Sequence, residues 1–70
     1  MGRVSYNMVK KWVAESDFAT EHNMKVGSWN GYYYVTRDGE IMVAGKTPSE
    51  LWYGFCLMRT GYYMGKDENN

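Results

Sequence analysis

The chain has 70 residues, and its eight basic and eight acidic residues give a formal charge of zero. Without a basic surface, non-specific binding to DNA or RNA is disfavoured, because that binding depends on contacts of lysine and arginine with phosphates. The lone Cys56 excludes an internal disulfide, and with the lone His22 it leaves too few ligands for a structural zinc site. No apolar run approaches the roughly 20 residues of a membrane span. We therefore expect one small cytoplasmic domain that binds no cofactor and no membrane.

The first predicted element is a helix over residues 5–22. Ser5 is a suitable N-cap, because its hydroxyl can accept a hydrogen bond from a free amide of the first turn. Apolar residues recur at helical spacing along one stripe, which comprises Met8, Trp12 and Ala19. Phe18 falls among the polar positions of such a helix. Either its ring is exposed, or the helix breaks near Glu15 and Ser16-Asp17 caps a second short turn. We expect one continuous helix.

Two turn signals define the middle of the chain. Asn30-Gly31 and Asp38-Gly39 are dipeptides that two-residue type I′ turns favour, because both central residues need a positive φ. The segments around them are rich in Tyr, Val, Ile, Thr and Trp, which suit a pleated surface. We predict a three-stranded antiparallel meander with strands over 24–29, 32–37 and 40–45.

A regular register through both turns sorts the side chains of this sheet onto two faces. In that register Val35 lies opposite Met42, and Tyr34 lies opposite Val43. The face that we expect the helices to cover carries Met24, Val26, Ser28, Tyr33, Val35, Met42 and Ala44. The other face carries Lys25, Gly27, Trp29, Tyr32, Tyr34, Thr36, Ile41 and Val43. An ordinary one-sided sheet has a polar outer face, so the apolar second face is the main functional indication in the sequence.

The last predicted element is a helix over 48–60. Thr47 is a good N-cap, a proline follows it, and Glu50 lies three residues later, as in a capping box. Gly54 permits close approach to the sheet, and Gly61 is expected to end the helix in a left-handed conformation. This helix is apolar almost all round, which favours a contact shared with a partner. The candidates for that contact are Trp52, Tyr53 and Leu57.

The sequence carries no catalytic signature. A nucleophile pair would have to combine Cys56 with His22, but the middle of an apolar helix is where structural rather than reactive cysteines are found. Glu15 and Asp17 lie on different faces of the predicted helix, so they do not form a carboxylate pair. The glycines of the central region are explained by strands and turns rather than by a phosphate-binding loop. We expect no enzymatic activity.

The predicted elements give a single two-layer α+β domain, ordered α-β-β-β-α over residues 1–64, with a flexible polar tail over 65–70. This order resembles that of the double-stranded-RNA-binding domain, and the aromatic face is similar in kind to the base-stacking platforms of single-strand binders. The resemblance implies RNA binding. It departs from that family at the start of the last helix, where a basic cluster is replaced by residues 47–50, whose one charge is negative, and the loop between Trp29 and Tyr32 lacks the family's histidine. Binding of RNA or single-stranded nucleic acid is therefore the alternative function.

Protein binding is the function that the composition favours most. The seven Tyr, three Trp and six Met residues belong to types that are enriched at the centres of protein interfaces. The expected contact residues are Trp29, Tyr32, Tyr34, Ile41 and Val43 on the sheet, and Trp52, Tyr53 and Leu57 on the last helix. The partner would be a second copy, giving a homodimer, or a larger protein on which the chain docks as an inhibitor or adaptor. In size and topology the chain resembles accessory proteins of phages and other mobile elements, including anti-CRISPR inhibitors, and this resemblance implies inhibition of a host or defence protein.

Overall fold

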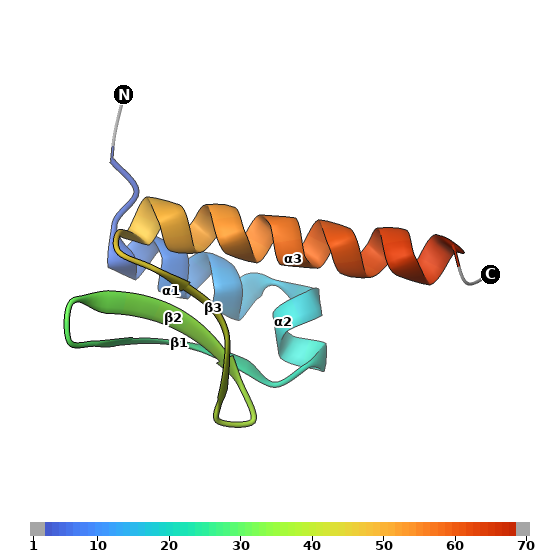
Figure 1. Ribbon diagram of the computed structural model, residues 1–70, viewed down its shortest axis with the longest axis horizontal. Coiled ribbons are helices and arrows are strands. Elements are labelled where there is room, and N and C mark those ends of the chain that lie inside the picture. Colours follow the sequence, from blue (N-terminus) through green and yellow to red (C-terminus); the bar gives the residue numbers. More distant parts are fainter. Residues whose placement is uncertain (1–2, 69–70) are drawn as a thin grey trace.

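The computed structural model describes residues 3–68, which form three helices and one sheet (Figure 1). In chain order the elements are α1 (Tyr6–Glu15), α2 (Asp17–Glu21), β1 (Met24–Trp29), β2 (Tyr32–Arg37), β3 (Glu40–Gly45) and α3 (Pro48–Glu68). The strands form an antiparallel sheet in the order β1-β2-β3, and α1 and α3 lie on the same side of it (Figure 1). The predicted α+β domain, with a three-stranded meander at these boundaries, is confirmed.

Both turns of the meander have the predicted backbone conformation. Asn30 and Gly31 have φ of 54° and 83°, and Asp38 and Gly39 have φ of 52° and 85°. Two consecutive positive φ values define a type I′ turn, whose twist matches that of the flanking strands. The first turn sets the β1–β2 register from Trp29 opposite Tyr32 onward, as predicted.

The register between β2 and β3 differs from the prediction because β3 contains a bulge. Thr36 lies opposite Ile41, but Val35 lies opposite Val43, so Met42 is the extra residue. The predicted pairing of Val35 with Met42 is therefore wrong. A bulge shifts all later residues of its strand by one position and so exchanges their faces. Val43 consequently faces the helices, whereas Met42 and Ala44, which we expected in the core, are exposed.

Packing against α3 gives the physical reason for this bulge. A Cβ atom placed on Gly54 of α3 would lie 2.7 Å from Cγ1 of Val43. The glycine allows close approach of the helix to the sheet, as predicted, and Val43 fills the space that it leaves. Val43 is partly buried there, and each Å² of apolar surface removed from water is favourable by about 25 cal/mol, which helps to offset the local disruption of the ladder.

The segment predicted as one helix, residues 5–22, forms two helices, α1 and α2. Ser16 has extended backbone (φ −78°, ψ 125°), and its hydroxyl accepts a hydrogen bond from the amide of Ala19 at 3.5 Å, so it caps α2. The expectation of one continuous helix is wrong, and the break near Ser16 is the arrangement that forms. It turns Phe18 inward until only 3% of its surface is exposed. Burial of this aromatic ring stabilises the break.

α3 begins as predicted and extends further. The amide of Glu50 donates to Oγ1 of Thr47 at 3.1 Å, while the Glu50 carboxylate accepts from the amide of Lys46 at 2.8 Å rather than from that of Thr47. Gly61 lies within the helix, so its predicted role as a C-terminal cap is wrong. The predicted tail is helical as far as Glu68, and its last residues, 69–70, lie outside the described residues.

An aromatic cluster holds the extension of α3. The ring centroids of Tyr62 and Tyr63 lie 5.2 Å and 5.9 Å from that of Phe18, and His22 lies 4.9 Å from Tyr62. Tertiary packing of this kind, rather than intrinsic propensity, supplies most of the stability of a helix. The break at Ser16 and the length of α3 are therefore linked through Phe18.

The core lies between the helices and the inner face of the sheet. Its buried members are Val9, Val13, Phe18, Ala19, Val35, Leu51 and Phe55. Leu51 and Phe55 are fully buried, whereas Trp12, on the apolar stripe of α1, is only half-buried. Because every helix packs on the inner side, no element among residues 3–68 covers the opposite face of the sheet (Figure 1).

Candidate protein-binding surface

The uncovered side of the sheet, here called the outer face, presents large apolar side chains to solvent. It is formed by Lys25, Gly27, Trp29, Tyr32, Tyr34, Thr36, Ile41 and Ala44, with the bulged Met42 beside them. The exposed fractions of Trp29, Ile41, Tyr32 and Met42 are 74%, 56%, 47% and 43%. Contiguous exposed apolar residues of this size on a small domain mark a binding surface more often than chance.

Tyr34 occupies the middle of the outer face and is half-buried although no helix covers it. A Cβ atom on its cross-strand partner Gly27 would stand 2.9 Å from Cε2 of Tyr34, so the tyrosine ring lies across the glycine. This contact covers the backbone of β1 with an aromatic ring. Tyr34 therefore forms a flat, supported centre between the more exposed Trp29 and Ile41.

The outer face carries little charge. Lys25 is the only charged residue among its members, and the hydroxyls of Tyr32, Tyr34 and Thr36 provide its polar groups. The hydroxyl of Thr36 lies 3.5 Å from the carbonyl oxygen of Lys25, to which it donates a hydrogen bond. An apolar centre with hydroxyls and a single cation has the composition of a protein interface rather than of a phosphate-binding surface.

The structure places four of the five predicted sheet residues together on this face. Trp29, Tyr32, Tyr34 and Ile41 lie on it, whereas Val43 faces the helices because of the bulge. Met42 takes the exposed position instead and was missed. Neither residue adjacent to Met42 is a glycine or a proline that would mark a bulge.

The second predicted contact, on α3, separates into two parts. Tyr53 and Leu57 are exposed, by 67% and 56%. Trp52 points instead between the helices, where its ring stacks on Phe55 at 5.6 Å and lies 4.9 Å from the ring of Trp12. Trp52 is thus partly committed to the packing of α1 on α3, and only Tyr53 and Leu57 are free for a partner.

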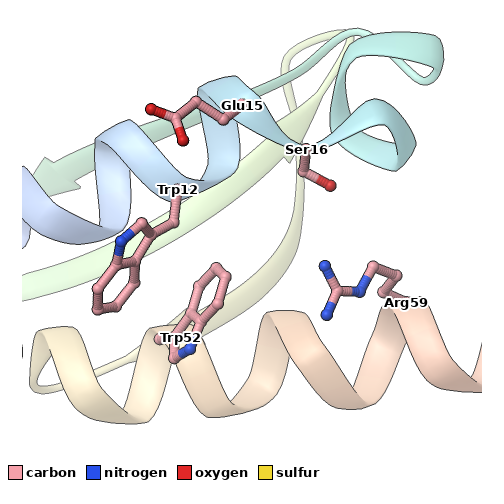
Figure 2. A pocket seen from close by; sticks show the side chains of 5 residues that line it. All are labelled: Trp12, Glu15, Ser16, Trp52 and Arg59. Atoms are coloured by element: carbon pink, nitrogen blue, oxygen red, sulfur yellow. The ribbon is translucent and has the colours of Figure 1, made fainter.

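A shallow pocket of about 330 Å³ lies between α1 and α3 (Figure 2). It is lined by Trp12, Glu15, Ser16, Trp52 and Arg59. Figure 2 shows the two indole rings next to each other, with the carboxylate of Glu15 on the α1 side and the guanidinium of Arg59 on the α3 side, apart from each other. Arg59 lies over the ring of Phe55 at 5.9 Å, a cation–π contact. The pocket has the volume of the smallest ligand sites, and the sequence did not indicate it.

Cys56 and His22, the two residues of the candidate nucleophile pair, lie within helix α3 and at the end of α2. Cys56 is a half-buried free thiol on α3. Nδ1 of His22 lies 2.8 Å from the carbonyl oxygen of Phe18, to which it can donate a hydrogen bond, and its ring packs on Phe18 and Tyr62. Within residues 3–65, whose side chains the structure describes, no three His, Cys, Asp or Glu side chains are grouped closely enough to hold a metal ion.

In the described part of the chain, no helix combines the length and apolar character needed to cross a bilayer.

Comparison with known proteins gives no relative from which a function could be transferred. No protein-family model matches the chain, and no curated protein or solved structure matches it significantly.

Proposed function

We propose that this protein is a non-enzymatic protein-binding module that contacts its partner through the outer face of the sheet. The observation that supports the proposal is the exposure of Trp29, Tyr32 and Ile41 around a supported Tyr34 on a face that no helix covers. Trp and Tyr are the residue types that contribute most to binding energy at the centres of protein interfaces. The partner is a second copy of the chain or a larger protein, on which the domain acts as an inhibitor or adaptor.

The composition of the outer face favours protein over nucleic acid as the partner. Single-strand binders combine stacking aromatics with a basic groove that follows the phosphates. Here Lys25 is the only cation of the face. Tyrosine hydroxyls at the rim suit hydrogen bonding with a protein surface.

The proposal is tested by replacing two exposed side chains of the outer face together, Trp29→Ser with Ile41→Ser. Met64→Ser is the matched control, since Met64 is 59% exposed on α3 and belongs to neither predicted contact. Light scattering over a concentration series shows whether the protein is a dimer, and affinity capture from a cell lysate reports a foreign partner. We expect the double variant to lose association while it retains a cooperative thermal transition, and the control to behave as the wild type.

The outcomes separate the two kinds of partner. A dimer that the double variant converts to a monomer identifies a second copy as the partner. A monomer that captures a protein, and loses it only in the double variant, identifies a larger partner. Association that survives the double variant contradicts the proposal, and unfolding of that variant would show that the outer face stabilises the fold instead.

A further inference from the structure

The free edge of β1 carries backbone groups without a partner strand. β1 pairs only with β2, so one side of its backbone faces away from the sheet. In a hairpin with a two-residue turn, the residues that flank the turn exchange both hydrogen bonds, and bonded and non-bonded pairs alternate from there. Trp29, Gly27 and Lys25 therefore bond to β2. The amide and carbonyl groups of Val26 and Ser28 point outward.

Within residues 3–65, whose backbone and side chains the structure describes, these outward groups have no substitute hydrogen-bond partner. The backbone hydrogen bonds outside the helices and strands lie at the helix ends and loops, and none of them involves Val26 or Ser28. Unpaired edge groups of this kind are a template for an additional strand.

A groove of about 330 Å³ lies between this edge and α1. It is lined by Lys10, Val13, Ala14, Met24, Lys25 and Val26. Met24 and Val26 project to the inner face and Lys25 to the outer face, and side chains from both faces can line one groove only at the edge of a strand. The groove therefore follows the unpaired side of β1.

The groove combines an apolar floor with two positive charges. Val13 is buried and Val26 is half-buried, whereas Lys10 and Lys25 are exposed. Nζ of Lys10 lies 5.3 Å from the centre of the Tyr6 ring, which in turn packs on Tyr33 at 5.2 Å. Lys10 thus lines the groove from the helix side, with its ammonium group over an aromatic ring, and Lys25 lines it from the strand side.

We propose that this groove binds an extended acidic segment of a partner protein, which adds to β1 as a fourth, antiparallel strand. Hydrogen bonds to Val26 and Ser28 hold its backbone, as in other complexes formed by strand addition to a sheet edge. Residues opposite Val26 share its face and lie against α1, so they are apolar. The alternate residues lie beside Lys25 and are acidic. This site shares Lys25 with the outer face, but it uses the backbone edge of β1 rather than the exposed aromatic side chains, and it does not depend on their function.

A second copy of the chain fits this edge poorly. Antiparallel pairing of two β1 strands would bring Lys10 and Lys25 of both copies to one interface. Like charges close together across strands are destabilising, and lysines on sheet edges discourage self-pairing. The same lysines favour an acidic strand.

The charge requirement is tested with a labelled peptide of alternating valine and glutamate, seven residues long and blocked at both ends, and with its lysine analogue. We expect fluorescence anisotropy to show binding of the glutamate peptide that is at least about tenfold tighter than that of the lysine peptide. Lys25→Glu should reverse this preference. Lys46→Glu, which changes an exposed lysine outside the groove, should leave it unchanged.

The hydrogen-bonding requirement is tested by methylating peptide amides. In an antiparallel pair, residues directly opposite each other share a face, so the valines opposite Val26 and Ser28 make the bonds to β1. N-methylation of the valines should abolish binding, and N-methylation of the glutamates should be tolerated. Amide exchange measured by NMR should slow at Val26 and Ser28 on binding, while Gly27, already bonded to β2, stays unchanged.

Three results would overturn the proposal. The first is absence of binding at millimolar glutamate peptide. The second is equal binding of the two methylated peptides, which would indicate contact without strand addition. The third is protection of Val26 and Ser28 that rises with protein concentration in the absence of peptide, because a second copy would then occupy the edge. In the Trp29→Ser/Ile41→Ser variant peptide binding should persist, so this site and the outer face can fail independently.

Discussion

Cγ1 of Val43 lies against the backbone of Gly54, where a Cβ atom would stand 2.7 Å away. This contact joins the bulged strand β3 to the first half of α3. It exists only because the bulge turns Val43 toward the helices.

Gly54→Ala should destabilise the fold although alanine is the better helix former. The overlap with Val43 is expected to cost about 1–3 kcal/mol, against a gain of up to about 1 kcal/mol from helix propensity. Urea unfolding measures the difference. In the Val43→Ala background the same substitution should be neutral or stabilising, because the methyl group then has room. Stabilisation in the wild-type background would mean that Val43 points away from α3.

Gly61→Ala should stabilise the fold, in contrast to Gly54→Ala. Apart from its chain neighbours and the nearby backbone of its own helix, no atom lies within 4 Å of a Cβ placed there, and the residue is inside α3. Replacing an exposed glycine inside a helix by alanine is expected to raise the free energy of unfolding by about 0.5–1 kcal/mol, which thermal denaturation resolves as a shift of a few degrees. A lower melting temperature would indicate a left-handed cap at this position and an earlier end of the helix.

Ser16→Ala tests the break between α1 and α2. Loss of the hydroxyl that accepts from the Ala19 amide should cost about 1 kcal/mol. Ser16→Asp, which retains a capping oxygen, is the control and should remain close to the wild type. In one continuous helix alanine would be preferred to serine at this position, so stabilisation by Ser16→Ala would contradict the break.

Gly27→Ala should disturb the centre of the outer face. The new methyl group would meet the Tyr34 ring at 2.9 Å, and the ring must swing away to make room. We expect a loss of about 1 kcal/mol in unfolding free energy, at the lower end of overpacking costs because a ring edge can move. A double-mutant cycle with Tyr34→Ala isolates the contact. Equal effects of Gly27→Ala in both backgrounds would show that the ring does not cover the glycine.

Local chemistry made the sheet largely predictable. Asn30-Gly31 and Asp38-Gly39 specify both the turn type and the first pairs of each hairpin, so the strand boundaries follow from counting. The bulge at Met42 could not be predicted by counting residues from the turn, because it arises from the packing of Val43 against Gly54. That contact links positions in different elements and leaves no local pattern.

The helices show the same division between local and tertiary causes. Ser16 is a good N-cap residue, but it lies in the middle of an apolar stripe. The helix breaks there only because Phe18 can then enter a buried site. Phe55 and Tyr62 provide that site, with ring centroids 6.0 Å and 5.2 Å from Phe18. The residues of the outer face that belong to β1 and β2 could be predicted from the register of the first hairpin. Val43 was wrongly assigned to this face because it follows the bulge.

The meander also has a consequence for the order of folding. Each strand pairs only with its neighbour in the chain, across a turn of two residues. Hairpins of this kind form in about 1–10 μs, and local contacts carry a small loop-closure cost. α1 and α2 meet α3 across the intervening sheet, through Trp12–Trp52 and Phe18–Tyr63, so docking of the helices requires longer loop closures than any strand pairing. We therefore expect the strands to pair first and the Trp12–Trp52 contact to form late, so that folding rates depend on the helices rather than on the sheet.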